Sequence, residues 1–587
     1  MRTSIRLPIP ALLGLVTVLF VSACDREAGP PAPPSDEGLA PTPQADDAPI
    51  RALYVCANRF VVLNDHPFAV PVAWRIQGTD EHGELTLKAA PAGDPAFSEV
   101  EISARQAGNL ILLRDNQVLV VREHEHLACE PTVGPPSLAV AGSSTAGSWT
   151  APATWPIVPV HLHLLLNGKV LAWGKFGDPY VWNPSGNTFT AYPVGTNLFC
   201  SGHATLPDGK LFVAGGHISD NHGLPDANIF DPKTSKWTSL PAMKWGRWYP
   251  TVTELPSGQM VVMGGKDQNG QLVQTTEVWN GTSWRSLTGA LRNLPMYPRN
   301  FLAPNGRIFY AGELRRTLYL NTTNAGSWSV VGDRRFGTRD YGAAVMYLPG
   351  KILYAGGGRT TATAETIDLT APSPAWNYTQ PMAYPRRHLN ATMLPTGDVL
   401  VTGGVRGTSF NEISMGVRVA ESWNPETGAW TQLASSAINR GYHATSILLP
   451  DGRVLHAGSG DALDPNGKPY PPERNGELFS PPYLFKGARP VVSSLSTTTP
   501  AYGATVTVNT PTPSAITKVS MIAIGSATHA FDYNQRFMWL TFTKTSTGVS
   551  VKMPATGSKS TAPPGYYMLF LLNGNGVPSV GKFIRLH

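Results

Sequence analysis

Four short stretches of this chain carry side chains that could bind a metal ion or react with one another. They are Cys200 in Asn197-Leu-Phe-Cys-Ser-Gly202, Tyr249 in Arg247-Trp-Tyr-Pro250, Tyr442 and His443 in Arg440-Gly-Tyr-His443, and His529 in Gly525-Ser-Ala-Thr-His-Ala530. Adjacent residues of a regular strand point to opposite faces. Tyr442 and His443 can therefore serve one site only if the backbone is irregular there. We hypothesise that both bind a metal ion whose other ligands lie far away in the sequence.

Residues 151–485 repeat a pattern of a turn glycine, an apolar strand and a second glycine or glycine pair. The seven turn glycines are Gly168, Gly209, Gly258, Gly306, Gly350, Gly397 and Gly452, and tryptophans follow at 237, 284, 328, 376 and 430. A period of about 40–50 residues with this pattern predicts a seven-bladed β-propeller of the kelch type.

Three of the four stretches occupy the same place in this repeat. Cys200 and Tyr249 each lie nine residues before a turn glycine, and Tyr442 and His443 lie ten and nine residues before theirs. Equivalent positions in different blades point toward one axis, so these side chains can meet there. His529 lies outside the repeats and can join them only if a hairpin from the C-terminal region reaches that axis.

The remaining composition is typical of an all-β protein with several domains. Gly (58) and Pro (53) are abundant and charged residues make up only 15%. Residues 50–131 alternate in short apolar runs, which predicts a small β-sandwich, and we expect Cys56 and Cys129 to form a disulfide across it. Residues 132–150 are predicted to be a linker, and residues 486–587 a second β-sandwich.

The N-terminus is predicted to be an export signal. Residues 1–23 combine two arginines with a short apolar core, and Val21-Ser22-Ala23-Cys24 is similar to a bacterial lipobox with Cys24 as the lipidated residue. The alternative is an ordinary cleaved signal with a chance cysteine. With Cys24 lipidated, Pro-rich residues 24–49 would tether a cell-envelope lipoprotein, on the periplasmic side or at the cell surface, whose only membrane attachment is this anchor.

The net charge of +6 is spread without a basic run, so no nucleic-acid partner is expected. We also expect a monomer.

The motifs around the reactive residues resemble those of the copper radical oxidases, the family of galactose oxidase and glyoxal oxidase. The matching segments are Phe199-Cys200-Ser-Gly202, Tyr249, Tyr442-His443 followed by Leu448-Leu-Pro-Asp-Gly-Arg-Val454, Thr528-His529, and Pro564-Gly-Tyr-Tyr-Met-Leu-Phe570. The resemblance covers about three quarters of the chain. It implies a C-terminal immunoglobulin-like (early-set) sandwich beside the propeller.

The resemblance also implies a ligand set and a reaction. His443, His529 and Tyr249 would lie in the plane of one Cu²⁺ ion and Tyr442 would be axial, an N₂O₂ set that suits tetragonal copper better than zinc. Cys200 would be joined through sulfur to the ring of Tyr249, which makes a Tyr249 radical easier to form. With Tyr442 as general base, the Tyr249 radical would abstract hydrogen from a primary alcohol or a small hydrated aldehyde, and O₂ would leave as H₂O₂.

Each of these residues taken alone has an ordinary structural interpretation. A single buried cysteine is most often a small hydrophobe, and Tyr249 or His529 alone would be a packed aromatic or a turn residue. Their joint occurrence, at matching offsets, favours the copper site. His203, His217, His222, His388 and His456 are interpreted as surface or loop residues, and His161 and His163 as structural.

One departure from the family pattern bears on the substrate. Galactose oxidase has a tryptophan just after the glycine pair of the blade that carries its radical tyrosine, whereas Lys266 and Asp267 stand here. Trp245 or Trp248 would have to cover the site instead.

The competing hypothesis is a non-catalytic surface protein whose kelch propeller binds a glycan or a protein partner.

Overall fold

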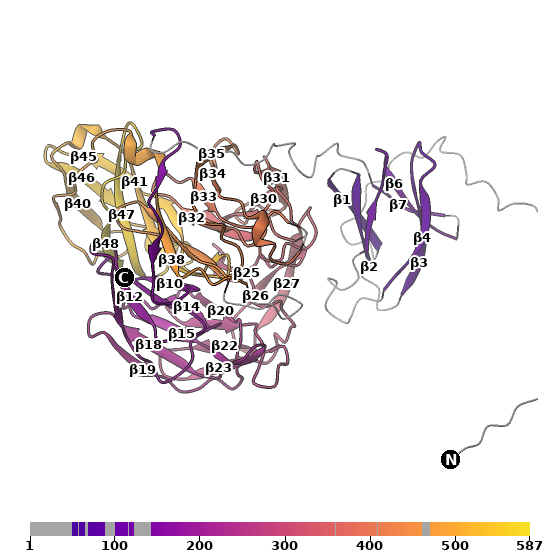
Figure 1. Cartoon of the computed structure of the whole chain (residues 1–587), viewed down its shortest axis with the longest axis horizontal. Coiled ribbons are helices and arrows are strands. Elements are labelled where there is room, and N and C mark those ends of the chain that lie inside the picture. Colours follow the sequence, from indigo (N-terminus) through magenta and orange to yellow (C-terminus); the bar gives the residue numbers. More distant parts are fainter. Residues whose placement is uncertain are drawn as a thin grey trace, which may run out of the picture. The chain divides into compact units, whose positions relative to one another are not determined.

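A computed structural model of the chain describes residues 50–56, 58–64, 69–88, 100–115, 117–122, 143–358, 360–407, 409–460 and 470–587 (Figure 1). The expected all-β class is confirmed for these residues. Their helices are four short 3-10 turns, η2 (Ile413–Met415), η3 (Pro482–Phe485), η4 (Pro513–Ala515) and η5 (Thr556–Ser558). No helix of the described residues is long and apolar enough to cross a membrane. The predicted leader, the tether, Cys24 and Cys129, the expected disulfide partner of Cys56, lie outside the described residues.

Seven successive antiparallel sheets occupy the described part of residues 148–480, and within most of them the strands follow one another in chain order. The first three sheets contain β10 (His161–Leu164), β11 (Val170–Trp173), β12 (Tyr180–Asn183) and β13 (Thr188–Ala191); β14 (Gly202–Thr205), β15 (Leu211–Ala214), β18 (Ala227–Asp231) and β19 (Lys236–Ser239); and β20 (Thr251–Glu254), β21 (Met260–Met263), β22 (Thr276–Trp279) and β23 (Trp284–Leu287). A separate hairpin of β16 (His217–Ser219) and β17 (His222–Gly223) leaves the second sheet.

The other four sheets follow the same plan. They contain β24 (Asn300–Leu302), β25 (Ile308–Tyr310), β26 (Arg316–Asn321) and β27 (Ser327–Asp333); β28 (Ala343–Leu348), β29 (Lys351–Ala355), β30 (Ala364–Asp368) and β31 (Trp376–Thr379); β32 (Asn390–Met393), β33 (Val399–Thr402), β34 (Val419–Trp423) and β35 (Trp430–Ser435); and β36 (Ala444–Leu448), β37 (Val454–Gly458) and β38 (Asn475–Ser480), joined by β8 (Ser148–Trp149) and β9 (Ala153–Thr154).

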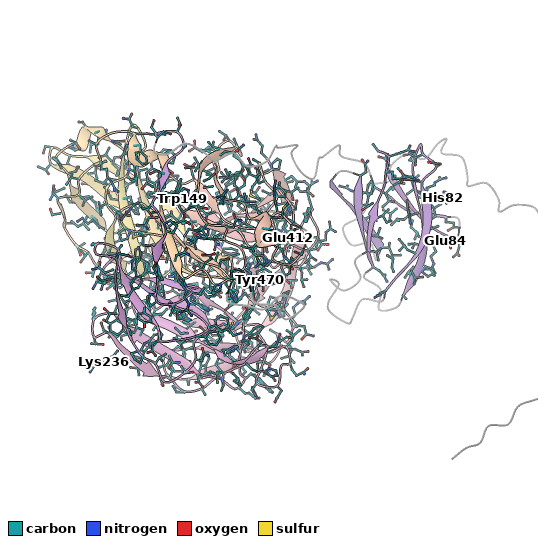
Figure 2. The ribbon with its side chains drawn as sticks, in the orientation of Figure 1. His82, Glu84, Trp149, Lys236, Glu412 and Tyr470 are labelled. Carbon is teal, nitrogen blue, oxygen red and sulfur yellow. The ribbon has the colours of Figure 1, made fainter. Side chains whose placement is uncertain are left out.

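The last sheet is therefore built from both ends of the repeat region. Phe479 of β38 pairs with Trp149 of β8, although more than 300 residues separate them in the chain. Trp149, labelled in Figure 2, also donates its indole N–H to the carbonyl of Ala434 in β35 at 2.8 Å. β8 thus ties the last sheet to the one before it.

The glycine after the second strand of a repeat has a steric reason. A Cβ atom on Gly215 would lie 2.3 Å from the carbonyl oxygen of Arg247, and one on Gly356 would lie 2.5 Å from that of Arg386. Both glycines also have positive φ. The strand end of one repeat therefore packs directly against the loop that precedes the first strand of the next. These loops are the ones in which the reactive residues stand.

The C-terminal region forms two further sheets around a separate apolar cluster. One contains β39 (Ser494–Leu495), β40 (Thr505–Asn509), β46 (Gly548–Lys552) and β45 (Phe542–Lys544), and the other β44 (Phe537–Trp539), β41 (Ile516–Ala523), β47 (Gly565–Asn573) and β48 (Lys582–Leu586). Val506, Val551, Met521 and Leu569, drawn from both sheets, are fully buried in this cluster.

A hairpin of β42 (Ser526–Thr528) and β43 (Phe531–Asp532) leaves the C-terminal sheets and pairs with β10, the first strand of the first of the seven sheets. The register places His161 opposite Thr528. The hairpin that His529 requires is therefore present.

The N-terminal segment has two sheets of its own. One contains β1 (Ile50–Cys56), β2 (Arg59–Asn64) and β5 (Val100–Ser103), and the other β4 (His82–Leu87), β3 (Val70–Ile76), β6 (Leu110–Arg114) and β7 (Gln117–Arg122). Phe60 and Val62 of the first sheet share one buried cluster with Val70, Leu110 and Leu112 of the second. His82 and Glu84 on β4 are labelled in Figure 2.

Candidate functional site

The loop before the first strand of each repeat carries a strained residue at a fixed position. Nine residues before the turn glycine, six of the seven repeats hold a non-glycine residue with positive φ. These residues are Cys200 (61°), Tyr249 (68°), Tyr297 (50°), Tyr341 (49°), His388 (61°) and His443 (69°). This conformation costs a non-glycine residue on the order of 1–3 kcal/mol and is common at functional sites. The irregular backbone predicted at Tyr442-His443 is confirmed.

Backbone hydrogen bonds link these loops to one another. The amide of Tyr249 donates to the carbonyl of Cys200 at 2.8 Å, that of Tyr297 to Tyr249 at 2.8 Å, and that of His388 to Tyr341 at 2.9 Å. Equivalent positions of neighbouring repeats are therefore adjacent in space. The convergence expected from the matching offsets is observed.

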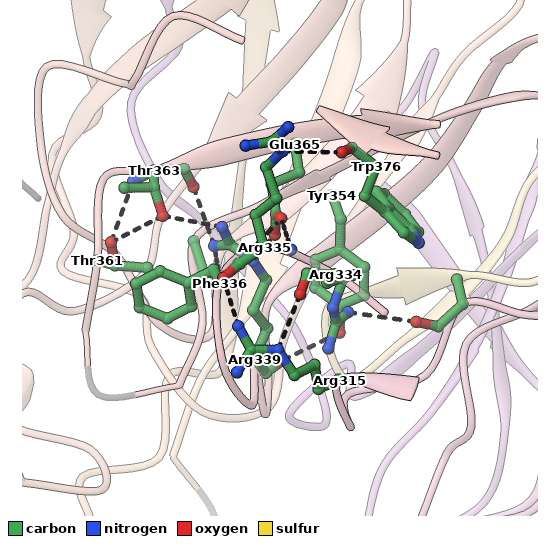
Figure 3. Close-up of polar contacts among 12 residues, drawn as sticks. Arg315, Arg334, Arg335, Phe336, Arg339, Tyr354, Thr361, Thr363, Glu365 and Trp376 are labelled. Carbon is green, nitrogen blue, oxygen red and sulfur yellow. Dashed lines mark hydrogen bonds and ion pairs between the residues drawn. The ribbon is translucent and has the colours of Figure 1, made fainter. Parts of the chain in front are cut away.

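A buried ion pair anchors four of these loops. The arginines are Arg247, Arg339, Arg386 and Arg440, and their partners on the third strand of the same repeat are Glu277, Glu365, Glu421 and Glu477, at 2.7–2.9 Å, with every side chain fully buried. Each arginine also donates to a glycine carbonyl at the end of the second strand, at 2.8–3.0 Å. Figure 3 shows Arg339 and Glu365 among the polar contacts of their repeat. Sequence reasoning missed these pairs, although an alignment of the repeats would have revealed them.

The hydroxyl of Tyr249 lies at the centre of the candidate site. Its oxygen is 2.5 Å from the hydroxyl oxygen of Tyr442, 2.9 Å from Nε2 of His529 and 3.5 Å from Nε2 of His443. Tyr249, His443 and His529 are buried, with 1–3% of each residue exposed, whereas Tyr442 is half-buried. Two phenol oxygens and two imidazole nitrogens thus converge at one point.

Hydrogen bonds fix which nitrogen of each imidazole faces that point. Nδ1 of His443 donates to the carbonyl of Gly460 at 2.6 Å. Thr528 donates its hydroxyl to the carbonyl of Val160 at 2.8 Å, so its oxygen accepts from Nδ1 of His529 at 2.6 Å. Both Nε2 atoms therefore keep a free lone pair, as in histidines that are held for metal binding.

The electrostatics of the site favour neutral side chains. Burial lowers the pKa of His443 to about 3 and that of His529 well below its ordinary value. Burial also raises the pKa of Tyr249 and of Tyr442 well above that of an ordinary phenol. Ionised phenols in this place need a nearby cation, which a divalent metal would supply.

The donor set decides which metal would fit. The described residues contain no group of three or more His, Cys, Asp or Glu side chains that could hold a metal ion. The phenols must therefore take part in any metal site here. Two imidazoles and two oxygen donors are a set that copper(II) accepts.

Cys200 is a fully buried free thiol beside Tyr249. Burial raises the pKa of the Cys200 thiol well above its ordinary value. Cys200, Tyr249 and Trp248 belong to one buried cluster, which also contains Tyr297. The pair expected to be cross-linked is thus brought into contact.

Trp248, and not Trp245, covers the ring of Tyr249. The two rings stack with centroids 3.8 Å apart and an interplanar angle of 18°. Tyr297 also stacks on Tyr249, at 4.4 Å. The tryptophan missing after Gly265 is thus replaced by the residue that directly precedes Tyr249.

Two histidines were wrongly expected at the surface or in loops, because His203 and His456 are fully buried in strands β14 and β37. His388 lies in a loop, as expected, but it is buried there, and Nε2 of His388 donates to the carbonyl of Phe410 at 2.6 Å. Tyr297, Tyr341 and His388 were missed by sequence reasoning, although their offset of nine residues from a turn glycine was a sufficient signal.

Comparisons with known proteins agree with this geometry. Residues 178–331 and 355–483 match the model of the glyoxal oxidase N-terminus, and residues 489–586 match the galactose oxidase-like early set domain. Galactose oxidase of Gibberella zeae is 29% identical over 492 residues, which cover 75% of this chain and 70% of that protein. Aldehyde oxidase GLOX of Vitis pseudoreticulata is 29% identical over 443 residues, 67% of this chain and 82% of the relative.

A solved structure extends the comparison. It is described as a novel fungal alcohol oxidase of the AA5 family in complex with copper, and it superposes with a TM-score of 0.68 at 26% identity, over 75% of this chain and 100% of its own. The chain belongs to the copper radical oxidase family of galactose oxidase and glyoxal oxidase. It is accordingly an oxidoreductase that acts on alcohols or aldehydes.

Proposed function

We propose that this protein is a copper radical oxidase whose metal is held by Tyr249, Tyr442, His443 and His529. The observation that carries the proposal is the approach of Tyr442, His529 and His443 to within 2.5, 2.9 and 3.5 Å of the Tyr249 hydroxyl. Copper would accept one of the two electrons removed from the substrate. A radical on Tyr249, joined to Cys200, would accept the other. The substrates would be a primary alcohol or a small aldehyde together with O₂, and H₂O₂ would be released.

Each of these residues has a distinct task in the proposal. Half-buried Tyr442 is the general base that receives the proton of the substrate hydroxyl, and this role suits the one site residue with access to solvent. The ring of Tyr249 takes the hydrogen from the substrate carbon. Trp248 keeps water away from that ring, and Cys200 feeds electron density into it.

Formation of the cross-link tests the proposal directly. The S–H bond of Cys200 and one ring C–H bond of Tyr249 break, and one S–C bond forms. Two protons and two electrons pass to O₂, which becomes H₂O₂. After incubation of the purified protein with copper and air, mass spectrometry should find the two peptides joined with the loss of two hydrogens.

Two variants serve as controls for that experiment. Cys200→Ser should retain copper but form no link, because Cys200 is not a proposed ligand, and Tyr249→Phe should lose both. A free thiol at Cys200 in the copper-treated wild type would contradict the oxidase proposal. That result would favour the non-catalytic binding protein instead.

We further propose that residues 151–485 form a seven-bladed kelch-type propeller, between a small sandwich at 50–131 and an immunoglobulin-like sandwich at 486–587. The seven sheets, the closing strand β8 and contacts between the first strands of successive sheets support this arrangement. Sandwich 50–131 would carry the Cys56–Cys129 disulfide, and the protein would be a monomer.

We also propose export as a lipoprotein, with residues 1–23 removed and Cys24 lipidated. The sequence pattern Val21-Ser22-Ala23-Cys24 supports this. Labelling of cells with a fatty-acid analogue should mark the wild type and not the Cys24→Ser variant. Equal labelling of both, or of neither, would contradict lipidation at Cys24.

A further inference from the structure

The indole of Trp248 is held from its far end by a histidine. Its N–H donates to Nδ1 of His217 at 3.2 Å, while its ring stacks on Tyr249. The backbone of Trp248 is fixed separately, because its amide and carbonyl exchange hydrogen bonds of 2.7 and 2.8 Å with Lys266. The contact with His217 is therefore the polar restraint on the indole itself.

His217 is in turn held at a definite angle. It begins strand β16, its amide donates to the carbonyl of Asn197 at 3.0 Å, and its ring packs edge-on against Phe199 at 5.1 Å. Phe199 directly precedes Cys200 in the chain. The hairpin of β16 and β17 thus touches both the loop of the thiol and the tryptophan over the phenol.

The hydrogen bond with Trp248 also fixes the tautomer of His217. An indole N–H can only donate, so Nδ1 of His217 must carry a lone pair, and the ring proton must sit on Nε2. Nε2 lies 3.9 Å from Oδ1 of Asp220, and both oxygens of Asp220 accept from Lys175, at 3.0 and 3.2 Å. The His217 side chain is 10% exposed and that of Asp220 is 54% exposed. A polar chain therefore runs from the solvent to the buried stack.

We propose that His217 is a positioning residue, which holds the indole of Trp248 flat on the ring of Tyr249 and so sets the lifetime and reduction potential of a radical there. The inference rests on the proposed function, since it concerns the Tyr249 radical. An indole released by His217 would leave the ring of Tyr249 open to water on that side.

The experiment compares two substitutions of His217 with a matched control. His217→Leu removes the acceptor, whereas the side-chain oxygen of His217→Asn can replace Nδ1. His222→Leu is the control, because His222 stands on the same hairpin and contacts Ser219 and Asp220. Copper-loaded proteins are oxidised by one electron with ferricyanide, and the decay of the radical absorption and the midpoint potential are recorded. Mass spectrometry of the Cys200–Tyr249 link is performed on every variant.

We expect the radical of His217→Leu to decay about fivefold faster or more. Loss of one neutral hydrogen bond lowers the population of the stacked indole by about this factor. Its midpoint potential should shift too, and His217→Asn and His222→Leu should match the wild type. When Trp248→Phe is already present, adding His217→Leu should change neither quantity further, because the indole N–H is then gone.

The outcomes separate the two claims. If the wild type carries the link and the radical but His217→Leu has the same decay and potential, the role of His217 is overturned and the proposed function stands. If the wild type forms neither link nor radical, both are overturned. Should His217→Leu fail to fold, His217→Phe takes its place, since it also lacks an acceptor, and an unchanged decay and potential in that variant would overturn the inference.

Discussion

The two imidazoles of the site reach it by different routes. His443 belongs to a repeat loop that is anchored by the buried pair of Arg440 and Glu477. His529 sits in the two-residue turn of the hairpin β42–β43, where it and Ala530 both have positive φ. Hairpins prefer Asn or Gly at such positions, so His529 and Ala530 make this turn less stable than it could be. The strained turn places an imidazole at the site.

The difference lies in what holds each residue. The loop of His443 is held by the Arg440–Glu477 pair of its own sheet and by the preceding repeat, where Asn411 accepts from the amide of Tyr442 at 3.0 Å. His529 depends on contacts between distant segments, since its carbonyl accepts from Arg299 at 3.1 Å and its ring is oriented through Thr528 by the carbonyl of Val160. The repeats thus supply three of the four proposed metal ligands, and the fourth, His529, comes from outside them.

The largest effect should follow from removal of either ring. We expect His443→Ala and His529→Ala each to lose the copper-dependent activity and to weaken copper binding by more than about a hundredfold, beyond the loss caused by changes outside the ligand shell. Chelator competition measures the affinity. Retention of tight binding by one of the two variants would show that the two imidazoles are not equivalent ligands.

The next-largest effect should follow from removal of the ion pair that anchors the loop of His443. Arg440→Met leaves Glu477 buried without its partner, which should cost about 3–5 kcal/mol of unfolding free energy, measured with urea. Arg386→Met is the matched control, because Arg386 pairs with Glu421 in the same way but holds the loop of His388. Both variants should be equally destabilised, and only Arg440→Met should lose copper affinity. Equal copper affinity in the two variants would argue against the anchor role.

The stability of the folded protein should depend on pH through Asp532, in the hairpin of His529. Burial raises the pKa of Asp532 to about 6, although three backbone N–H groups stabilise its carboxylate. The folded protein then holds this proton more tightly than the unfolded chain does, so stability falls as the pH rises from about 4 to about 6. That difference in pKa between the unfolded and folded states corresponds to about 3 kcal/mol.

Asp532→Asn should remove that part of the pH dependence. Urea unfolding of the apoprotein at several pH values compares the variant with the wild type, and the difference between their unfolding free energies should change between pH 4 and pH 6, in the direction that favours the variant at the higher pH. A difference that stays constant with pH would contradict the raised pKa of Asp532.

The smallest effect should come from Thr528→Val. The substitution keeps the shape of the side chain but removes the hydroxyl that accepts from Nδ1 of His529. Loss of such an outer partner typically weakens metal binding by about 10–100-fold. The same chelator assay checks this, and unchanged affinity would indicate that another group fixes the tautomer of His529.

Sequence reasoning was strongest for the site residues that occupy equivalent positions in the repeats. The glycine period and the offset of nine residues brought Cys200, Tyr249 and His443 together, because equivalent loops must be adjacent. It was weaker for His529, which was a candidate from the start but could join the others only if a hairpin from the C-terminal region reached them. Pairing between β10 and β42 joins residues more than 350 positions apart, and no local pattern encodes it.

Other parts of the site were hidden for different reasons. Trp248 was only one of two tryptophans considered, since the direction of a side chain next to a strained residue cannot be deduced from spacing. The buried arginine–glutamate pairs escaped because charged residues are ordinarily expected in solvent. The fold class was predictable from composition and period, whereas the contacts that orient each ligand were not.

The pairing of β8 with β38 has a consequence for biosynthesis. Cys200 and Tyr249 leave the ribosome early, but the sheet that carries Tyr442 and His443 receives its partner strand only after residue 480 has been made, and His529 follows later still. A nascent or truncated chain therefore lacks part of the proposed ligand set. Copper binding by all four proposed ligands would therefore require a chain that has been translated past residue 529.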